Sequence, residues 1–98
     1  MFIATTRDLF HILDNRAWYS YGTTLLKQKL GVDERTLADL IGKLDRELQE
    51  AGSGDKVNVF IFNNVEYAGL ESRRLDYERD KLAGTNHVER LIMLGIYN

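Results

Sequence analysis

The spacing of apolar residues changes once along this chain, from a helical period to a strand period. This change is the sequence feature that most narrows the possible folds. Between residues 33 and 51, leucine and isoleucine recur every three or four positions, as in a helix with one buried side. From residue 57 onward the period is two, as in a β-strand, with Val57, Val59 and Ile61 on one face and Asn58, Phe60 and Phe62 on the other. Gly52 and Gly54 separate the two patterns. We therefore predict a long helix over 33–51 and a β-hairpin over 57–70 that turns at Asn63-Asn64, because asparagine tolerates a positive φ.

Two shorter helices are predicted before the long one. Thr5 and Asp8 form a capping pattern, which predicts a helix of about two to three turns that ends before Asn15. A second helix is predicted over 25–30, capped by one of the two threonines that precede it. The aromatic residues between these helices favour a short strand or an extended connection.

Gly31 lies between the second helix and the long helix, where a helix-turn-helix requires a tight turn. Leucines flank this glycine on both sides and can form the contact between the two helices. The order of helix, strand, helix, turn, long helix and hairpin predicts an α+β fold of the winged helix-turn-helix type, with a three-helix core and a β-hairpin wing. A helical hairpin with a leucine core and no nucleic-acid role remains the alternative.

The long helix starts with Asp33-Glu34-Arg35-Thr36, and a glycine-containing loop and a strand lead on to Val65-Glu66-Tyr67. This pattern resembles the DNA-binding effector domain of OmpR/PhoB-type response regulators over residues 5–70, without their receiver domain. The positions that match the family's recognition helix are Arg35, Thr36, Ile41, Lys43, Leu44, Arg46 and Leu48. The resemblance implies a small transcriptional regulator that binds double-stranded DNA.

In such a regulator the long helix would read the major groove and the hairpin would lie along the backbone as a wing. The candidate DNA contacts are Thr23, Thr24, Lys27, Arg35, Thr36, Asp39, Lys43, Arg46, Asn63 and Asn64. A second interpretation is that the two cations Arg35 and Lys43 are ordinary solvated side chains paired with Asp39 or Glu47 at helical spacing.

The distribution of charge favours a different class of function. The whole chain has a net charge of −2, and residues 23–70 carry six basic against eight acidic side chains. Asp39, Asp45 and Glu47 lie on the helix that would approach phosphates, where a carboxylate is repulsive. The alternative function is therefore a winged-helix module that binds another protein, such as a virus-encoded antagonist or a subunit of a transcription or replication complex.

The last 28 residues extend beyond the predicted winged helix. We predict a first domain over 1–70 and a helical extension over 71–98, with a mostly charged helix over 72–82 and a markedly apolar final helix. Apolar residues of that final helix are candidates for docking on the domain or for a homodimer: Val88, Leu91, Ile92 and Ile96.

Composition excludes several other classes. The chain has 98 residues and no cysteine, so disulfides, thiol nucleophiles and cysteine-ligated metals are excluded. No apolar run is long enough to span a membrane, and we expect a cytoplasmic protein with no membrane partner. No catalytic motif or metal-binding pair stands out, so we expect no enzyme, no metal and no cofactor. Stacking of single strands on Trp18, Tyr19 and Phe60 is a third hypothesis, although a core role for the aromatic cluster is favoured.

Overall fold

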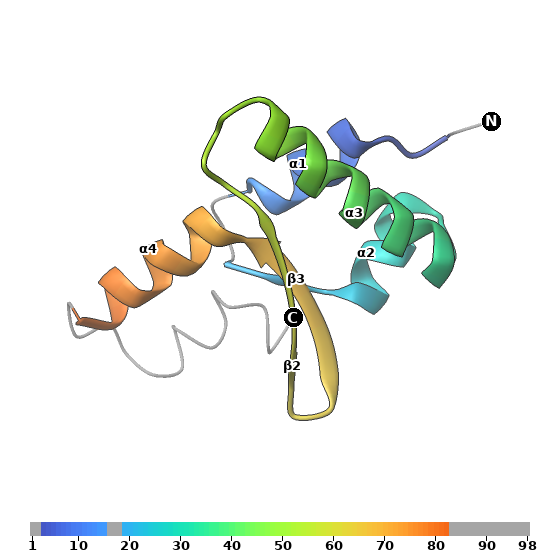
Figure 1. Ribbon diagram of the computed structural model, residues 1–98. Coiled ribbons are helices and arrows are strands. Elements are labelled where there is room, and N and C mark those ends of the chain that lie inside the picture. The colour runs from blue at the N-terminus through green and yellow to red at the C-terminus, as the bar shows by residue number, and fades with distance from the viewer. Residues whose placement is uncertain (1–2, 16–18, 83–98) are drawn as a thin grey trace.

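The fold is described by a computed structural model over residues 3–15 and 19–82, which form four helices and a three-stranded antiparallel sheet (Figure 1). The predicted α+β class is thereby confirmed. The elements in chain order are α1 (Thr6–Leu13), β1 (Tyr21–Gly22), α2 (Thr23–Leu30), α3 (Glu34–Glu50), β2 (Val57–Phe62), β3 (Val65–Leu70) and α4 (Glu71–Leu82).

Local caps account for the start of α1 and the end of α2. Thr5 and Asp8 form the predicted capping box, with the Thr5 amide donating to Asp8 Oδ2 at 2.9 Å and the Asp8 amide donating to Thr5 Oγ1 at 3.3 Å. The prediction for α2 was wrong at its start, because the helix begins at Thr23 and its N-cap is Gly22, which has no side chain to donate or accept. Gly31 ends α2 in the left-handed conformation at φ +65°, as predicted.

The long helix α3 begins where the sequence predicts. Asp33 is its N-cap, and the carboxylate accepts a hydrogen bond from the Thr36 amide at 2.8 Å. Hydrogen bonds from the side chain and backbone of Thr36 lower the pKa of the Asp33 carboxyl. The helix runs to Glu50, and Gly52 follows it at φ +68°.

The hairpin has the predicted bounds and register. Phe62 pairs with Val65 at the turn, and the ladder continues without interruption to Val57 and Leu70. Asn63 and Asn64 have φ values of 51° and 65°, the left-handed geometry that a two-residue turn requires. The sheet order is β1-β3-β2, so β2 forms one edge of the sheet.

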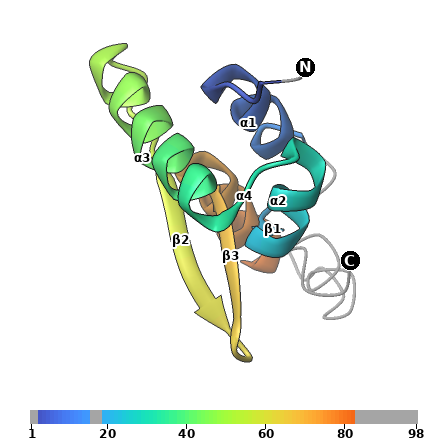
Figure 2. The same ribbon diagram turned by 90° about the vertical axis from the view of Figure 1, so that its right-hand side faces the viewer.

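The hydrophobic core lies between the sheet and the first three helices. In two perpendicular views α1, α2 and α3 gather on one side while the far end of the hairpin extends away from them (Figures 1 and 2). The core cluster consists of Leu9, Leu13, Tyr21, Leu26, Leu30, Leu37, Leu40, Leu44, Ala68 and Leu70. The leucines predicted on both sides of Gly31 are therefore core residues.

The segment containing Tyr19 and Ser20 lies closely against β3 at Gly69. The position where a Gly69 Cβ would stand is 2.7 Å from the Tyr19 carbonyl oxygen. Tyr19 is 2% exposed and Tyr21 is 4% exposed, which agrees with the favoured core role and removes Tyr19 as a stacking platform. Trp18 lies outside the described residues.

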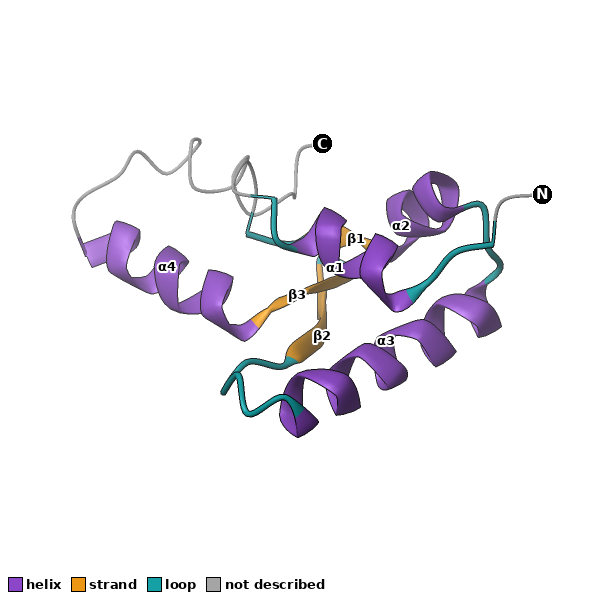
Figure 3. Ribbon diagram, turned by 90° about the horizontal axis from the view of Figure 1, so that it is seen from above, coloured by secondary structure: helices purple, strands orange, loops and turns teal. Residues whose placement is uncertain are grey.

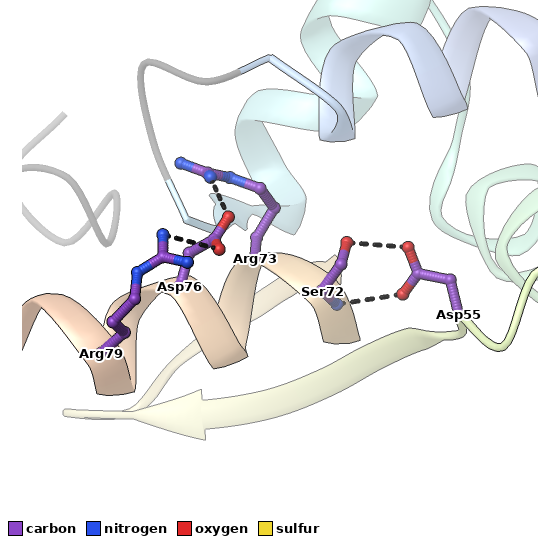
Figure 4. A network of polar contacts seen from close by, with 5 residues as sticks. All are labelled: Asp55, Ser72, Arg73, Asp76 and Arg79. Carbon is purple, nitrogen blue, oxygen red and sulfur yellow. Dashed lines mark hydrogen bonds and ion pairs between the residues drawn. The ribbon is translucent and has the colours of Figure 1, made fainter.

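Helix α4 follows β3 directly and leaves the molecule on the side opposite α2 (Figure 3). Its start is held by Asp55, which accepts from the Ser72 amide at 3.0 Å and from the Ser72 hydroxyl at 2.8 Å (Figure 4). The buried Arg73 forms an ion pair with Asp76 and lies over the Tyr19 ring, with its Cζ 4.8 Å from the ring centroid. The division into domains at residue 70 remains a prediction, and the final helix with Val88, Leu91, Ile92 and Ile96 lies outside the described residues.

The contacts of Glu71 lead to an expected pH dependence of stability. Hydrogen bonds from Arg74 and Asn58 lower the pKa of Glu71 from 4.5 to about 2. Because the folded-state pKa is the lower one, the stabilisation is present above pH 4.5 and is lost as the pH falls from 4.5 toward 2. Thermal melts of the native chain and of Glu71→Gln should therefore differ at neutral pH and converge toward pH 2. A difference in melting midpoint that stays constant over this range would contradict the expectation.

Candidate functional site

The candidate surface is the face of α3 that points away from the core. Leu37, Leu40 and Leu44 are buried on the inner side of the helix. The side chains predicted to contact DNA from this helix are all exposed: Arg35, Thr36, Asp39, Lys43 and Arg46. At 100° per residue Arg35, Asp39 and Arg46 lie nearly opposite the buried leucines, and Lys43 lies beside them. The structure thus brings the cations together on one side of the helix.

Two carboxylates of α3 are directed to its flanks. Asp45 Oδ1 accepts from the Val57 amide at 2.9 Å, and Asp45 Oδ2 accepts from the Gln49 side chain at 2.8 Å. Glu47 Oε2 accepts from the Thr6 hydroxyl at 2.8 Å. These contacts join α3 to β2 on one side and to α1 on the other. Of the three acids that the sequence places against a phosphate, only Asp39 lies on the outer face.

The cations of α3 have no carboxylate close enough for an ion pair within residues 3–15 and 19–82. The ion pairs found in these ranges all belong to α4. Asp76 pairs with both Arg73 and Arg79, and Glu71 pairs with Arg74. The predicted pairing of Arg35 and Lys43 with Asp39 or Glu47 is therefore not found. Arg35, Lys43 and Arg46 instead present their charges to solvent, where a phosphate could accept from them.

The α2 candidates are placed unequally. Thr24 is exposed, whereas Thr23 is only 9% exposed. The Thr23 hydroxyl donates a hydrogen bond to the Glu66 carbonyl oxygen at 3.5 Å. Lys27 is half-buried. Of the α2 candidates, Lys27 lies on the α3 side, and Thr24 is exposed to solvent.

A hollow of about 380 Å³ lies between α3 and the hairpin. Lys27 and Thr23 contribute to its wall from α2, Ala38 and Gly42 from α3, and Val59 and Glu66 from the hairpin. A Cβ built on Gly42 would meet only Arg46 Nη1, at 3.9 Å. The small residues of α3 therefore leave this hollow open, and sequence reasoning did not identify it.

The hairpin tip combines a polar turn with exposed apolar side chains. Asn63 and Asn64 are exposed as predicted, but Ile61 is 71%, Val65 46% and Phe62 41% exposed beside them. The hairpin strands carry no lysine or arginine. The tip can therefore offer amides to a phosphate, but no positive charge, and the exposed Glu66 of β3 carries a negative one.

The described helices include none that is both long and apolar enough to cross a membrane. No family model, curated protein or solved structure matches the chain.

Proposed function

We propose that this chain is a small winged helix-turn-helix regulator that binds double-stranded DNA, with α3 as its recognition helix and the β2–β3 hairpin as its wing. The order of elements and the sheet order β1-β3-β2 support this proposal. It also draws on the resemblance of residues 33–48 to the effector domain of OmpR/PhoB-type regulators.

The observation that carries the proposal is the exposed row of Arg35, Lys43 and Arg46 on α3. Residues 35 and 46 are about 16 Å apart along a helix that rises 1.5 Å per residue. This length exceeds the roughly 12 Å width of the major groove, so the row can reach phosphates on both of its sides. Thr36 lies in the first turn of α3, from which side chains reach base edges.

Asp39 is compatible with this role. A carboxylate inside the major groove can accept a hydrogen bond from the cytosine amino group, so one acid among three cations can read sequence. Phosphate contacts then provide most of the affinity and base contacts provide the specificity.

The test is a salt titration of the native chain on random duplex DNA, followed by fluorescence anisotropy. Three phosphate contacts predict a slope of about −2.7 in log K against log salt, since each contact contributes roughly −0.9. A protein with a net charge of −2 has no general attraction for DNA, so a slope of this size would report a local cationic surface. Absence of binding at low salt would overturn the proposal.

A winged-helix module that binds protein is the second candidate, and the apolar hairpin favours it. Ile61, Phe62 and Val65 are exposed, and the acidic Glu66 adjoins the hollow beside α3. Isolation of the chain's partners from a cell extract discriminates between the two functions. Recovery of nucleic acid alone would count against the second candidate.

A further inference from the structure

The edge strand β2 lacks the features that normally protect a sheet edge. Its sequence from Val57 to Phe62 contains no charged residue, no proline and no glycine, and the uncharged stretch continues to Val65. Its ladder with β3 has no bulge. Proteins usually protect an exposed edge by one of these devices, because open N–H and C=O groups pair with any suitable strand.

Exposed apolar side chains are concentrated on the same hairpin. Among the described residues, four of the six large hydrophobic side chains that are exposed belong to it, namely Val59, Ile61, Phe62 and Val65. The strand is apolar on both faces, since Val59 and Ile61 lie on one and Phe60 and Phe62 on the other. Figures 1 and 2 show that this end of the hairpin extends beyond the helices.

The geometry of the turn identifies the backbone groups that are open. A two-residue turn closes on a hydrogen-bonded pair, here Phe62 and Val65, and such pairs alternate along an antiparallel ladder. The N–H and C=O groups of Val59 and Ile61 therefore point away from β3, toward an edge that no strand of residues 3–15 or 19–82 covers. Val57 also faces this edge, but its N–H donates to Asp45. The segment available to a new strand is thus 59–61.

We propose that two copies of the chain associate through this segment, with β2 antiparallel to β2 around a two-fold axis, to form a continuous six-stranded sheet. In this symmetry opposed residues must lie on the same face of the sheet. In the expected register, Val59 and Ile61 form the hydrogen bonds between the two copies, whereas Val57 keeps its bond to Asp45. Phe60 then lies opposite Phe60 of the second copy, and Val59 lies opposite Ile61.

A second copy is the occupant that fits this edge best. The strand is self-complementary in this register, because apolar residues meet apolar residues near the axis and no charge opposes a like charge. Asp45 accepts the Val57 N–H and so occupies the part of the edge nearest the helices. A second strand can therefore pair only with the part nearer the hairpin tip. This association does not depend on DNA binding, and the experiments below are performed without DNA.

The first experiment uses cysteine cross-linking, since the natural chain has no cysteine. Phe60 opposite its copy would be a non-hydrogen-bonded pair with Cα atoms about 4.5 Å apart, within the range that a disulfide can bridge. Phe60→Cys should therefore form a covalent dimer on mild oxidation. Val65→Cys is the matched control on β3, one strand away from the edge, and should cross-link slowly. Equal rates for the two variants would overturn the proposal.

The second experiment measures mass by sedimentation equilibrium over a concentration series. The native chain should approach twice its monomer mass at high concentration. Ile61→Pro removes an N–H that points to the edge and leaves the β2–β3 ladder complete, so it should abolish the dimer. Ile61→Thr retains that N–H and should still dimerise, and circular dichroism should show both variants folded.

Three results would contradict the proposed edge pairing. A native chain that is monomeric at every concentration would show that β2 does not pair with a second copy. Dimerisation that survives Ile61→Pro would place the contact elsewhere. Loss of the dimer in Ile61→Thr as well as in Ile61→Pro would indicate an apolar contact without strand pairing.

Discussion

Replacing Gly69 by alanine is expected to destabilise the fold by about 3 kcal/mol, because overpacking a tight site costs roughly this much. The added Cβ would stand 2.7 Å from the Tyr19 carbonyl oxygen and 3.2 Å from two carbon atoms of Ser20. The nearest of these is a backbone atom, which cannot swing aside as the end of a flexible side chain can. The segment over β3 must therefore move as a whole.

That movement should extend to helix α4. Tyr19 supports the guanidinium of the buried Arg73, whose Cζ lies 4.8 Å from the ring centroid. Chemical denaturation of the Gly69→Ala variant, followed by circular dichroism, measures the loss of stability. Gly42→Ala is the matched control: its Cβ has room, and removal of a glycine from a helix should stabilise by about 1 kcal/mol. Equal stability of Gly69→Ala and the native chain would contradict the prediction.

The elements that were predicted from sequence are those determined by local signals. Thr5 and Asp33 cap helices through side chains that reach three residues ahead, and Gly31 and Asn63-Asn64 accept a positive φ. All the residues that form such a cap or turn lie within a few positions of one another in the sequence. Sequence alone therefore located α1, the end of α2, α3 and the hairpin.

Contacts between distant segments could not be predicted in the same way. Glu47 accepts from Thr6, which is 41 residues away, and Asp45 accepts from Val57, which is 12 residues away. The periodicity of α3 identified its outer face correctly, but it could not show that these two acids bond along the flanks. The same limit applies to Thr23, whose hydroxyl is directed to Glu66 across the fold.

The hairpin shows a third kind of limit. Alternation predicted which residues share a face, and the register confirms that Val57, Val59 and Ile61 do. The helices cover only part of that face, so Val57 is half-buried whereas Ile61 is 71% exposed. Burial of a strand depends on the length of the elements that pack on it, which its own residues do not encode.

Replacing Lys43 and Arg46 together by alanine is expected to weaken binding to duplex DNA roughly 100-fold at low salt, since a hydrogen bond to a charged group contributes about 1.5 kcal/mol. Both side chains are exposed on α3, and no carboxylate in the described part of the chain forms an ion pair with them. Their removal should therefore delete the proposed phosphate contacts without disturbing the core, and the melting temperature should be nearly unchanged.

The salt dependence separates these contacts from a general effect of charge. With Arg35 left as the third cation, the slope of log K against log salt should fall from about −2.7 to about −0.9. The matched control is Arg7→Ala with Lys56→Ala, which removes the same charge from exposed positions outside α3. Since charge remote from the groove adds little, the control should keep the native slope and nearly the native affinity. Equal losses in the two double variants would show that DNA responds to net charge alone, and α3 would then have no special role as the recognition helix.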